Sequence, residues 1–272
     1  MPTPFQHLLY SQRVFRAPGL PARVSHALET ERGAFLLGST AGDVQAITGQ
    51  PRVDTHFYRL SEPHERSAAE RFLLAYPELA APSLLLPTRA AFVSGYLVHL
   101  AWDEVWAEDI FIPFYRDADH WPDRMSYFVH HNALRVHLDR GAYGSLVQKE
   151  ALASLLGSVV PERWLPFVED AALIQWRDWL VEQLLDPAAI QTVEVFSRRM
   201  QVPPDRLEEI VDEMVRGTYV DVLGLDDALA RYEAMALAES MLTLLSYWGI
   251  SVNLSEPDRG RRAVPGHRQA GY

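Results

Sequence analysis

The segment from Thr88 to Ile112 constrains the fold most, because it is long, helical in pattern and apolar on nearly every side. Its centre reads AFVSGYLVHLAWDEVW, and a helix that is apolar all round has to be buried inside a larger structure. Pro87 suits the first position of this helix, and we expect Pro113 to end it. The rest of the chain must therefore supply helices that cover a long buried one.

Helical periodicity also dominates the rest of the sequence, whereas alternating strand patterns are scarce. We expect the region from Gly33 to Asp54, rich in Gly, Ser and Thr, to be an irregular loop or a short helical turn. The fold class predicted is an all-α multi-helix bundle, with residues 1–254 as a single domain and residues 255–272 as a disordered tail. The expected helices, several of which begin at a proline, are Pro4–Phe15, Ala22–Glu31, Ser61–Ala75, Thr88–Ile112, Asp123–Leu138, Gly144–Leu155, Pro161–Leu184, Pro187–Met200, Pro204–Thr218 and Leu225–Trp248.

Composition excludes several classes of site and partner. The 272 residues include no Cys, which removes disulfides, iron–sulfur clusters, thiolate zinc sites and a Cys nucleophile. The net charge of −11 argues against nucleic acid as a partner. No apolar stretch is long enough for a membrane span and no signal-type segment opens the chain, so a cytoplasmic location is expected. The oligomeric state is left open.

His99 and Asp103 form the most informative polar pair in the sequence. A spacing of four residues puts both side chains on one helix face, one turn apart, where they can reach a single divalent ion. An ionised Asp in this apolar segment needs a positive partner. The alternative is a buried His–Asp hydrogen bond without metal. Proteins of the HD-phosphohydrolase type also contain such a pair, but they need an adjacent His-Asp dipeptide, which this chain lacks.

Three further residues are candidate ligands, each with an ordinary alternative. Asp43 ends the run Gly-Ser-Thr-Ala-Gly-Asp, where small neighbours allow close backbone approach, but it could equally cap a helix or lie in a turn. His56, in Asp-Thr-His-Phe-Tyr, could be a surface histidine. His7, on the otherwise apolar first helix, could belong to the core or the surface.

Taken together, the five residues follow a family pattern. An early helical His, then Gly-x-x-Ala-x-Asp, then Thr-His-Phe-Tyr, then His-x-x-x-Asp on a long buried helix resembles the zinc-dependent phospholipase C family. The zinc-dependent fungal and plant nucleases are more distant relatives of that family. The resemblance covers roughly residues 1–140 and implies a multi-helix bundle of the phospholipase C type.

The resemblance implies a role for each matching residue. Asp43, His56, His99 and Asp103 would surround one zinc, and His7 would help to hold a second, with Asp103 bridging the two. The family's N-terminal Trp ligand has no counterpart in Met-Pro-Thr-Pro at the start of this sequence. We therefore expect one or two zinc ions, or another divalent metal in their place.

A third metal of the family uses a His six residues after the bridging Asp, where this chain has Asp109. A carboxylate is an acceptable replacement, so Asp109 is a sixth candidate ligand. The family's His-x-x-x-Glu pair on the next helix has no match in register. The residues that could complete a second site instead are Glu108, Asp109, His120, His130 and His131.

Other side chains near the pattern have less specific interpretations. Several aromatic residues line up around the candidate site, and they indicate either core packing or an apolar wall for a lipid or nucleoside group. Arg124 and Arg135 could clamp a phosphate or form surface ion pairs. The aromatic residues are Trp102, Trp106, Phe111, Phe114 and Tyr115.

The resulting hypothesis is a metal-dependent hydrolase that acts on a small-molecule or lipid-like phosphoester. The metal would lower the pKa of a bound water from about 15.7 toward about 7, and Asp43 would orient or deprotonate that water as the catalytic residue. The alternative is a non-catalytic helical binding module that keeps the fold and at most one structural metal.

Overall fold

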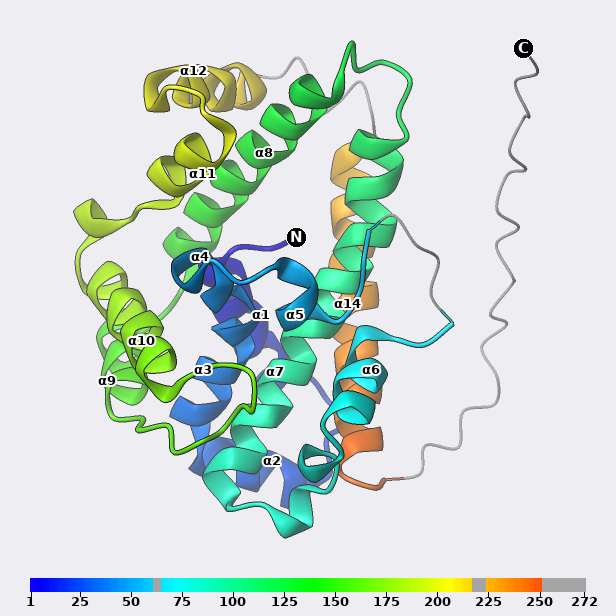
Figure 1. Cartoon of the computed structure of the whole chain (residues 1–272), viewed down its shortest axis with the longest axis vertical. Helices are drawn as coiled ribbons and strands as arrows, with labels where there is room; N and C mark the ends of the chain where they lie inside the picture. The colour runs from blue at the N-terminus through cyan, green and yellow to red at the C-terminus, as the bar shows by residue number, and fades with distance from the viewer. Residues whose placement is uncertain (61–64, 217–223, 251–272) are drawn as a thin grey trace.

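A computed structural model describes residues 1–60, 65–216 and 224–250 of the chain. These residues form an all-helical bundle in which the only β pairing is an isolated bridge between Leu165 and Val168. None of the described helices combines the length and apolar character needed to cross a lipid bilayer. The α-helices, labelled where room allows in Figure 1, are α1 (Pro4–Arg16), α2 (Ala22–Thr30), α3 (Arg32–Ala41), α4 (Gln45–Thr48), α5 (Arg52–His56), α6 (Ala68–Ala75), α7 (Pro87–Trp106), α8 (Arg124–Ser145), α9 (Lys149–Gly157), α10 (Asp170–Leu185), α11 (Thr192–Met200), α12 (Pro204–Val215) and α14 (Leu225–Tyr247).

Helix α7 runs through the middle of the bundle, with α3 and α14 packed against it (Figure 1). Nearly all of its side chains are buried, which confirms the long central helix expected from the apolar pattern. Two of its ionisable members, His99 and Asp103, are as completely buried as the leucines beside them. The centre of the fold is therefore mostly apolar, and α7 contributes these two side chains to it.

Helix α3 lies so close to α7 that two glycines form the contact. A Cβ atom added to Gly38 would lie 2.0 Å from the carbonyl oxygen of Phe92, and one added to Gly95 would lie 2.0 Å from that of Phe35. The expectation of a loop or short turn from Gly33 to Asp54 is therefore wrong, because most of this segment is helical. Its small residues allow close helix packing. A helix packed in this way is as rich in Gly, Ser and Thr as a loop.

The end of the central helix also differs from the expectation. The helical path does not stop at Pro113 but continues as η4 (Ala107–Arg116), a π-helical segment that contains this proline. It ends where the Asp117 amide donates to the Ile112 carbonyl, five residues earlier. The wider π turn carries the chain past a residue that would kink an ordinary α-helix.

Several other helix boundaries need correction. Helix α6 begins at Ala68, where the Ser67 hydroxyl accepts a hydrogen bond from the Glu70 amide, so the N-cap lies after the predicted Ser61. Helix α10 begins at Asp170 rather than Pro161. The expected start at residues 61–64 and the expected tail at 255–272 fall outside the described residues.

Candidate metal centre

Five side chains from four parts of the chain meet beside α7. His7 comes from the buried face of α1, and Asp43 from the short 3₁₀ turn η1 (Gly42–Val44) that follows α3. His56 is the last residue of α5, while His99 and Asp103 lie one turn apart on α7. The structure thus brings together five of the six candidate ligands named from the sequence.

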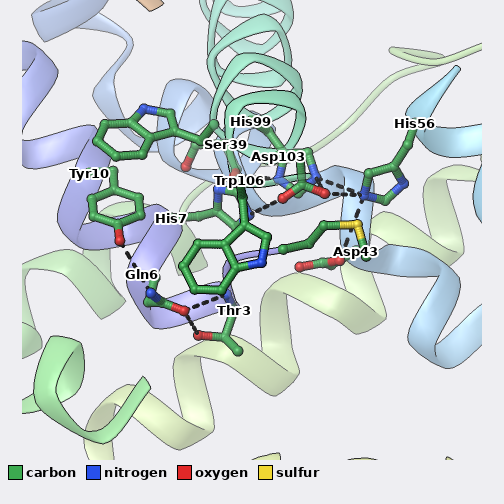
Figure 2. A network of polar contacts seen from close by, with 12 residues as sticks. Thr3, Gln6, His7, Tyr10, Ser39, Asp43, His56, His99, Asp103 and Trp106 are labelled. Atoms are coloured by element: carbon green, nitrogen blue, oxygen red, sulfur yellow. Dashed lines mark hydrogen bonds and ion pairs between the residues drawn. The ribbon is translucent and has the colours of Figure 1, made fainter. Parts of the chain in front are cut away.

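The carboxylate of Asp103 lies between two of the histidines, as Figure 2 shows. Its Oδ1 atom is 3.4 Å from Nε2 of His7, and its Oδ2 atom is 3.0 Å from Nε2 of His56. The His99 Nε2 atom is 3.2 Å from that of His56, and the His99 ring stacks on His7 with centroids 4.0 Å apart. Asp43 is at the edge, with Oδ1 3.9 Å from His56 Nε2.

The outer ring nitrogens of two histidines contact polar groups of the neighbouring chain segments. Nδ1 of His99 is 3.0 Å from the Ser39 carbonyl, which can only accept, so Nδ1 donates and Nε2 has a free lone pair. Nδ1 of His56 is 2.8 Å from the Thr55 hydroxyl. That hydroxyl is also 3.3 Å from the Arg52 carbonyl. The Nε2 atoms of both rings face each other inside the cluster, 3.2 Å apart.

This geometry fits a bound metal ion. Two ligand atoms of a tetrahedral zinc, each bound at about 2.0–2.1 Å, lie roughly 3.3 Å apart. The His56–His99 separation of 3.2 Å and the His7–Asp103 separation of 3.4 Å are close to that value. His7 Nε2 and Asp103 Oδ1 are also buried without a hydrogen-bond partner among the described residues. A cation would supply the missing partner for both atoms.

The ligand atoms form two overlapping groups that could each hold an ion. One group is His7, His99 and Asp103, and the other is Asp43, His56 and His99, with all atoms of a group within 4.8 Å of one another. His99 belongs to both groups. The family resemblance implied instead that Asp103 would be the shared residue. We refer to the five residues together as the ligand cluster.

Burial sets the charge of the ligand cluster. It lowers the pKa of His99 well below the ordinary value, and it lowers the pKa of His56 as well. Burial alone would raise the pKa of Asp103, but the neighbouring histidines hold it well below its usual range. Neutral imidazoles beside an ionised carboxylate are the protonation states that metal binding requires.

A glycine leaves the space that His99 occupies. A Cβ atom added to Gly42 would lie 2.2 Å from Nε2 of His99. Any side chain at this position would overlap a ligand nitrogen that is completely buried. The glycine immediately before Asp43 is therefore part of the construction of the ligand cluster.

Arg52 contacts the ligand cluster and was not among the residues predicted from the sequence. Its NH2 group donates to Asp103 Oδ2 at 3.0 Å and to the Tyr58 hydroxyl at 2.7 Å, and that hydroxyl donates to the Asp103 carbonyl. Arg52 precedes His56 by four residues on α5, so the two share a helix face. The spacing of four residues would place Arg52 beside His56 if the segment were helical. The expectation of a loop or short turn from Gly33 to Asp54 did not include such a helix.

Asp109 is not brought into the ligand cluster. It lies in η4 and belongs to neither group of potential metal ligands. Within the described ranges, those two groups are the only ones with metal-ligand geometry, and neither contains Glu108, His120, His130 or His131.

Two of these histidines have other contacts instead. The buried His131 accepts a hydrogen bond from the Trp106 indole at 3.0 Å and packs among Phe111 and Tyr115. Burial lowers the pKa of His131 well below its usual value. His130 places Nδ1 2.7 Å from the Ser126 carbonyl.

The ligand cluster reaches open space through one residue. The side chains of His7, His56, His99 and Asp103 are at most 1% exposed, whereas that of Asp43 is 16% exposed. Asp43 lines a cavity of about 340 Å³, in the range typical of small-molecule pockets. No family model, no curated protein and no solved structure matches this chain.

Proposed function

We propose that this protein is a metal-dependent hydrolase of phosphate esters, with zinc held in the ligand cluster. The observation that carries the proposal is the pair of Nε2 atoms of His56 and His99, 3.2 Å apart and buried. Two imidazole nitrogens this close need a cation or a proton between them. A set of imidazoles and carboxylates without thiolate suits zinc or a neighbouring divalent metal.

Each residue of the ligand cluster then has a role. A bound zinc would supply a Lewis acid for the phosphoryl oxygen and a water that ionises near neutral pH. His7, His99 and Asp103 would hold one ion, and His56 and His99 with Asp43 would hold a second one. Asp43, which faces the cavity, orients the attacking water and takes its proton. Arg52 holds Asp103 in place through the 3.0 Å hydrogen bond to Oδ2.

The same residues support the proposed relationship to the zinc-dependent phospholipase C family. Their order along the chain, their convergence beside a central helix and the all-helical fold agree with that proposal. The bundle type and the family membership are proposed on these grounds alone.

A metal count and an activity assay on the same preparation test the function. The protein is purified without chelators or a His tag, its metal content is measured, and turnover of 4-nitrophenyl phosphate and bis(4-nitrophenyl) phosphate is followed. We expect bound metal and turnover that is lost on chelation and restored by zinc. Turnover that survives exhaustive chelation, or metal-loaded protein without turnover of either ester, would refute the proposal.

The variant Asp43→Asn tests the role of the cavity-facing carboxylate. Loss of a general base typically costs about 100-fold to 10,000-fold in rate, so kcat should fall by at least about 100-fold. Asp212→Asn, which changes an exposed carboxylate on α12 that pairs with Arg216, should leave kcat unchanged.

A second function is favoured by one observation. Four of the five ligand side chains are at most 1% exposed, and closed metal sites of this kind are usually structural. The protein would then be a binding module stabilised by its ion. In that case chelation would lower the thermal stability of the protein, and the loaded protein would turn over no ester.

A further inference from the structure

The cavity in front of Asp43 contains a concentration of positive charge. Arg135, Arg198 and Arg199 all line it, in a chain that has 36 acidic residues against 25 Lys and Arg. Through the part of the chain that the structure describes, none of these three guanidinium groups forms an ion pair within 4.0 Å. The cavity is therefore a local basic site on an acidic protein.

Arg135 is the unusual member of this group, because it is only 7% exposed. Its NH1 group donates to the Asn132 side chain at 2.9 Å, and its guanidinium lies over the Phe196 ring, 4.3 Å from the centroid. Burial lowers its pKa to about 10, which leaves it charged at neutral pH. A buried charge without a counter-ion is costly, and a bound anion would offset that cost.

The two carboxylates on the cavity wall do not neutralise this charge by direct contact. Asp43 belongs to the ligand cluster. Asp139 accepts hydrogen bonds from the hydroxyls of Thr3 and Thr192. Arg198 and Arg199 are exposed in the last turn of α11, where they also interact favourably with the helix dipole. Arg135, within α8, has no such role.

Two tryptophans also line the cavity. They are Trp176 and Trp179 of α10, with ring centroids 5.1 Å apart. Trp176 is buried and donates to the Thr40 hydroxyl, whereas Trp179 is partly exposed. A flat or apolar group can stack on such a surface, whereas a purely inorganic anion cannot use it.

We propose that this cavity binds the substrate as a phosphate monoester of an aromatic or other apolar alcohol. Arg135 binds the phosphoryl oxygens beside Asp43, Arg198 and Arg199 add positive charge at the cavity wall, and Trp179 contacts the organic group. Three guanidinium groups suit the two charges of a monoester better than the single charge of a diester. This inference rests on the proposed hydrolase function for the reaction, but the binding itself does not need the metal.

Binding is measured on chelated protein, in which no turnover is expected. The probe is 4-nitrophenyl phosphate, whose absorbance overlaps tryptophan emission, so it quenches the fluorescence of Trp176 and Trp179 when bound. Inorganic phosphate should compete with it. The diester bis(4-nitrophenyl) phosphate and the uncharged nitrobenzene should bind more weakly.

Arginine variants test the assignment directly. Arg135→Gln should weaken binding of the probe by at least about tenfold, the scale of one lost charge-assisted hydrogen bond. Arg135→Lys should lie between Arg135→Gln and wild type, because Lys keeps the charge but not the planar fork. Arg140→Gln, on the same helix but exposed and paired with Glu208, is the matched control and should bind as wild type does.

Two further variants keep the test decisive if Arg135→Gln fails to fold. The double variant Arg198→Gln/Arg199→Gln changes only exposed side chains and should weaken probe binding about threefold to tenfold. Trp179→Leu should weaken binding of 4-nitrophenyl phosphate but not of inorganic phosphate, as measured by calorimetry. Unchanged probe affinity in the arginine variants would overturn the cavity assignment.

The test of the binding site and the test of the proposed hydrolase function can fail independently of each other. If chelated protein binds the probe in the expected variant pattern but loaded protein never turns it over, the hydrolase proposal fails and the binding site stands. If loaded protein turns over 4-nitrophenyl phosphate with an unchanged KM in Arg135→Gln, the hydrolase stands and the cavity assignment fails.

Discussion

The Nε2 atom of His7 and the Oδ1 atom of Asp103 lie 3.4 Å apart in the interior of the protein, and neither has a hydrogen-bond partner among the described residues. Buried polar atoms are nearly always hydrogen-bonded, since leaving one unpaired costs about 1–3 kcal/mol. Two such atoms facing each other, from helices far apart in sequence, could hold a cation between them.

Replacing the central carboxylate should remove the metal. Asp103→Asn keeps the size of the side chain but removes its charge, so metal affinity should fall by more than roughly 100-fold, since even outer partners of metal ligands are worth about 10-fold to 100-fold. Metal content measured by mass spectrometry after gel filtration checks this. His99→Ala should have the same effect, because His99 belongs to both ligand groups.

The matched control for that experiment is another buried aspartate. Asp139 is 1% exposed, like the ligands, but it bonds two threonine hydroxyls and belongs to neither ligand group. Asp139→Asn should therefore keep its metal. Equal metal content in Asp103→Asn and Asp139→Asn would exclude the ligand cluster as the metal site.

Adding zinc to chelated protein should raise its melting temperature. At a free zinc concentration of about 100 times Kd, binding to the folded state adds about 2.7 kcal/mol of stability. For a domain of this size that corresponds to an increase in Tm of roughly 5–10 °C. Differential scanning fluorimetry with zinc and with magnesium measures the effect. An equal shift with both ions, or with neither, would speak against a site built from imidazoles.

Two glycines should respond to alanine in opposite directions. Gly42→Ala places a methyl group on the His99 ring nitrogen and should cost about 1–3 kcal/mol of unfolding free energy, with loss of metal. Gly141→Ala, in α8 with no atom within 4 Å of the added Cβ, should instead add about 0.5–1 kcal/mol. Chemical denaturation of both variants compares them. A Gly42→Ala protein as stable as wild type would show that the His99 ring lies elsewhere.

The stability difference between wild type and Asp139→Asn should depend on pH. Burial raises the pKa of Asp139 in the folded protein above its unfolded value. The folded state therefore holds the proton more tightly, and its stability falls as pH rises from below the unfolded pKa through the folded one. Asp139→Asn lacks this loss, so its Tm relative to wild type should rise between acidic and neutral pH. A constant difference across that range would contradict the raised pKa.

The sequence predicted the fold class and most of the ligand cluster because both leave local patterns. The buried α7 follows from a long segment that is apolar on nearly every side, and the spacing of His99 and Asp103 puts them on one face. His7, Asp43 and His56 have no local signature of ligation. They were found through a family resemblance, and their convergence is visible only in three dimensions.

What the sequence did not predict depends on contacts between distant segments. The small residues from Gly33 to Asp54 predict an irregular loop or a short helical turn. Helix α3 forms there instead, because Gly38 and its small neighbours allow close packing on α7, which lies far along the chain. Arg52 was missed for the same reason, since its helix was not expected. The cavity combines residues of α8, α10 and α11, which no local pattern connects.

The contact of α3 and α7 through Gly38 and Gly95 has a consequence for ion selectivity. Because backbone touches backbone there, neither helix can roll or slide without a collision, and no rotamer change can relieve it. His99 and the segment that leads into Asp43 therefore form a stiff frame. A metal bound as proposed would have to match the size of that frame, so its radius and preferred coordination number, more than its charge, would decide selectivity.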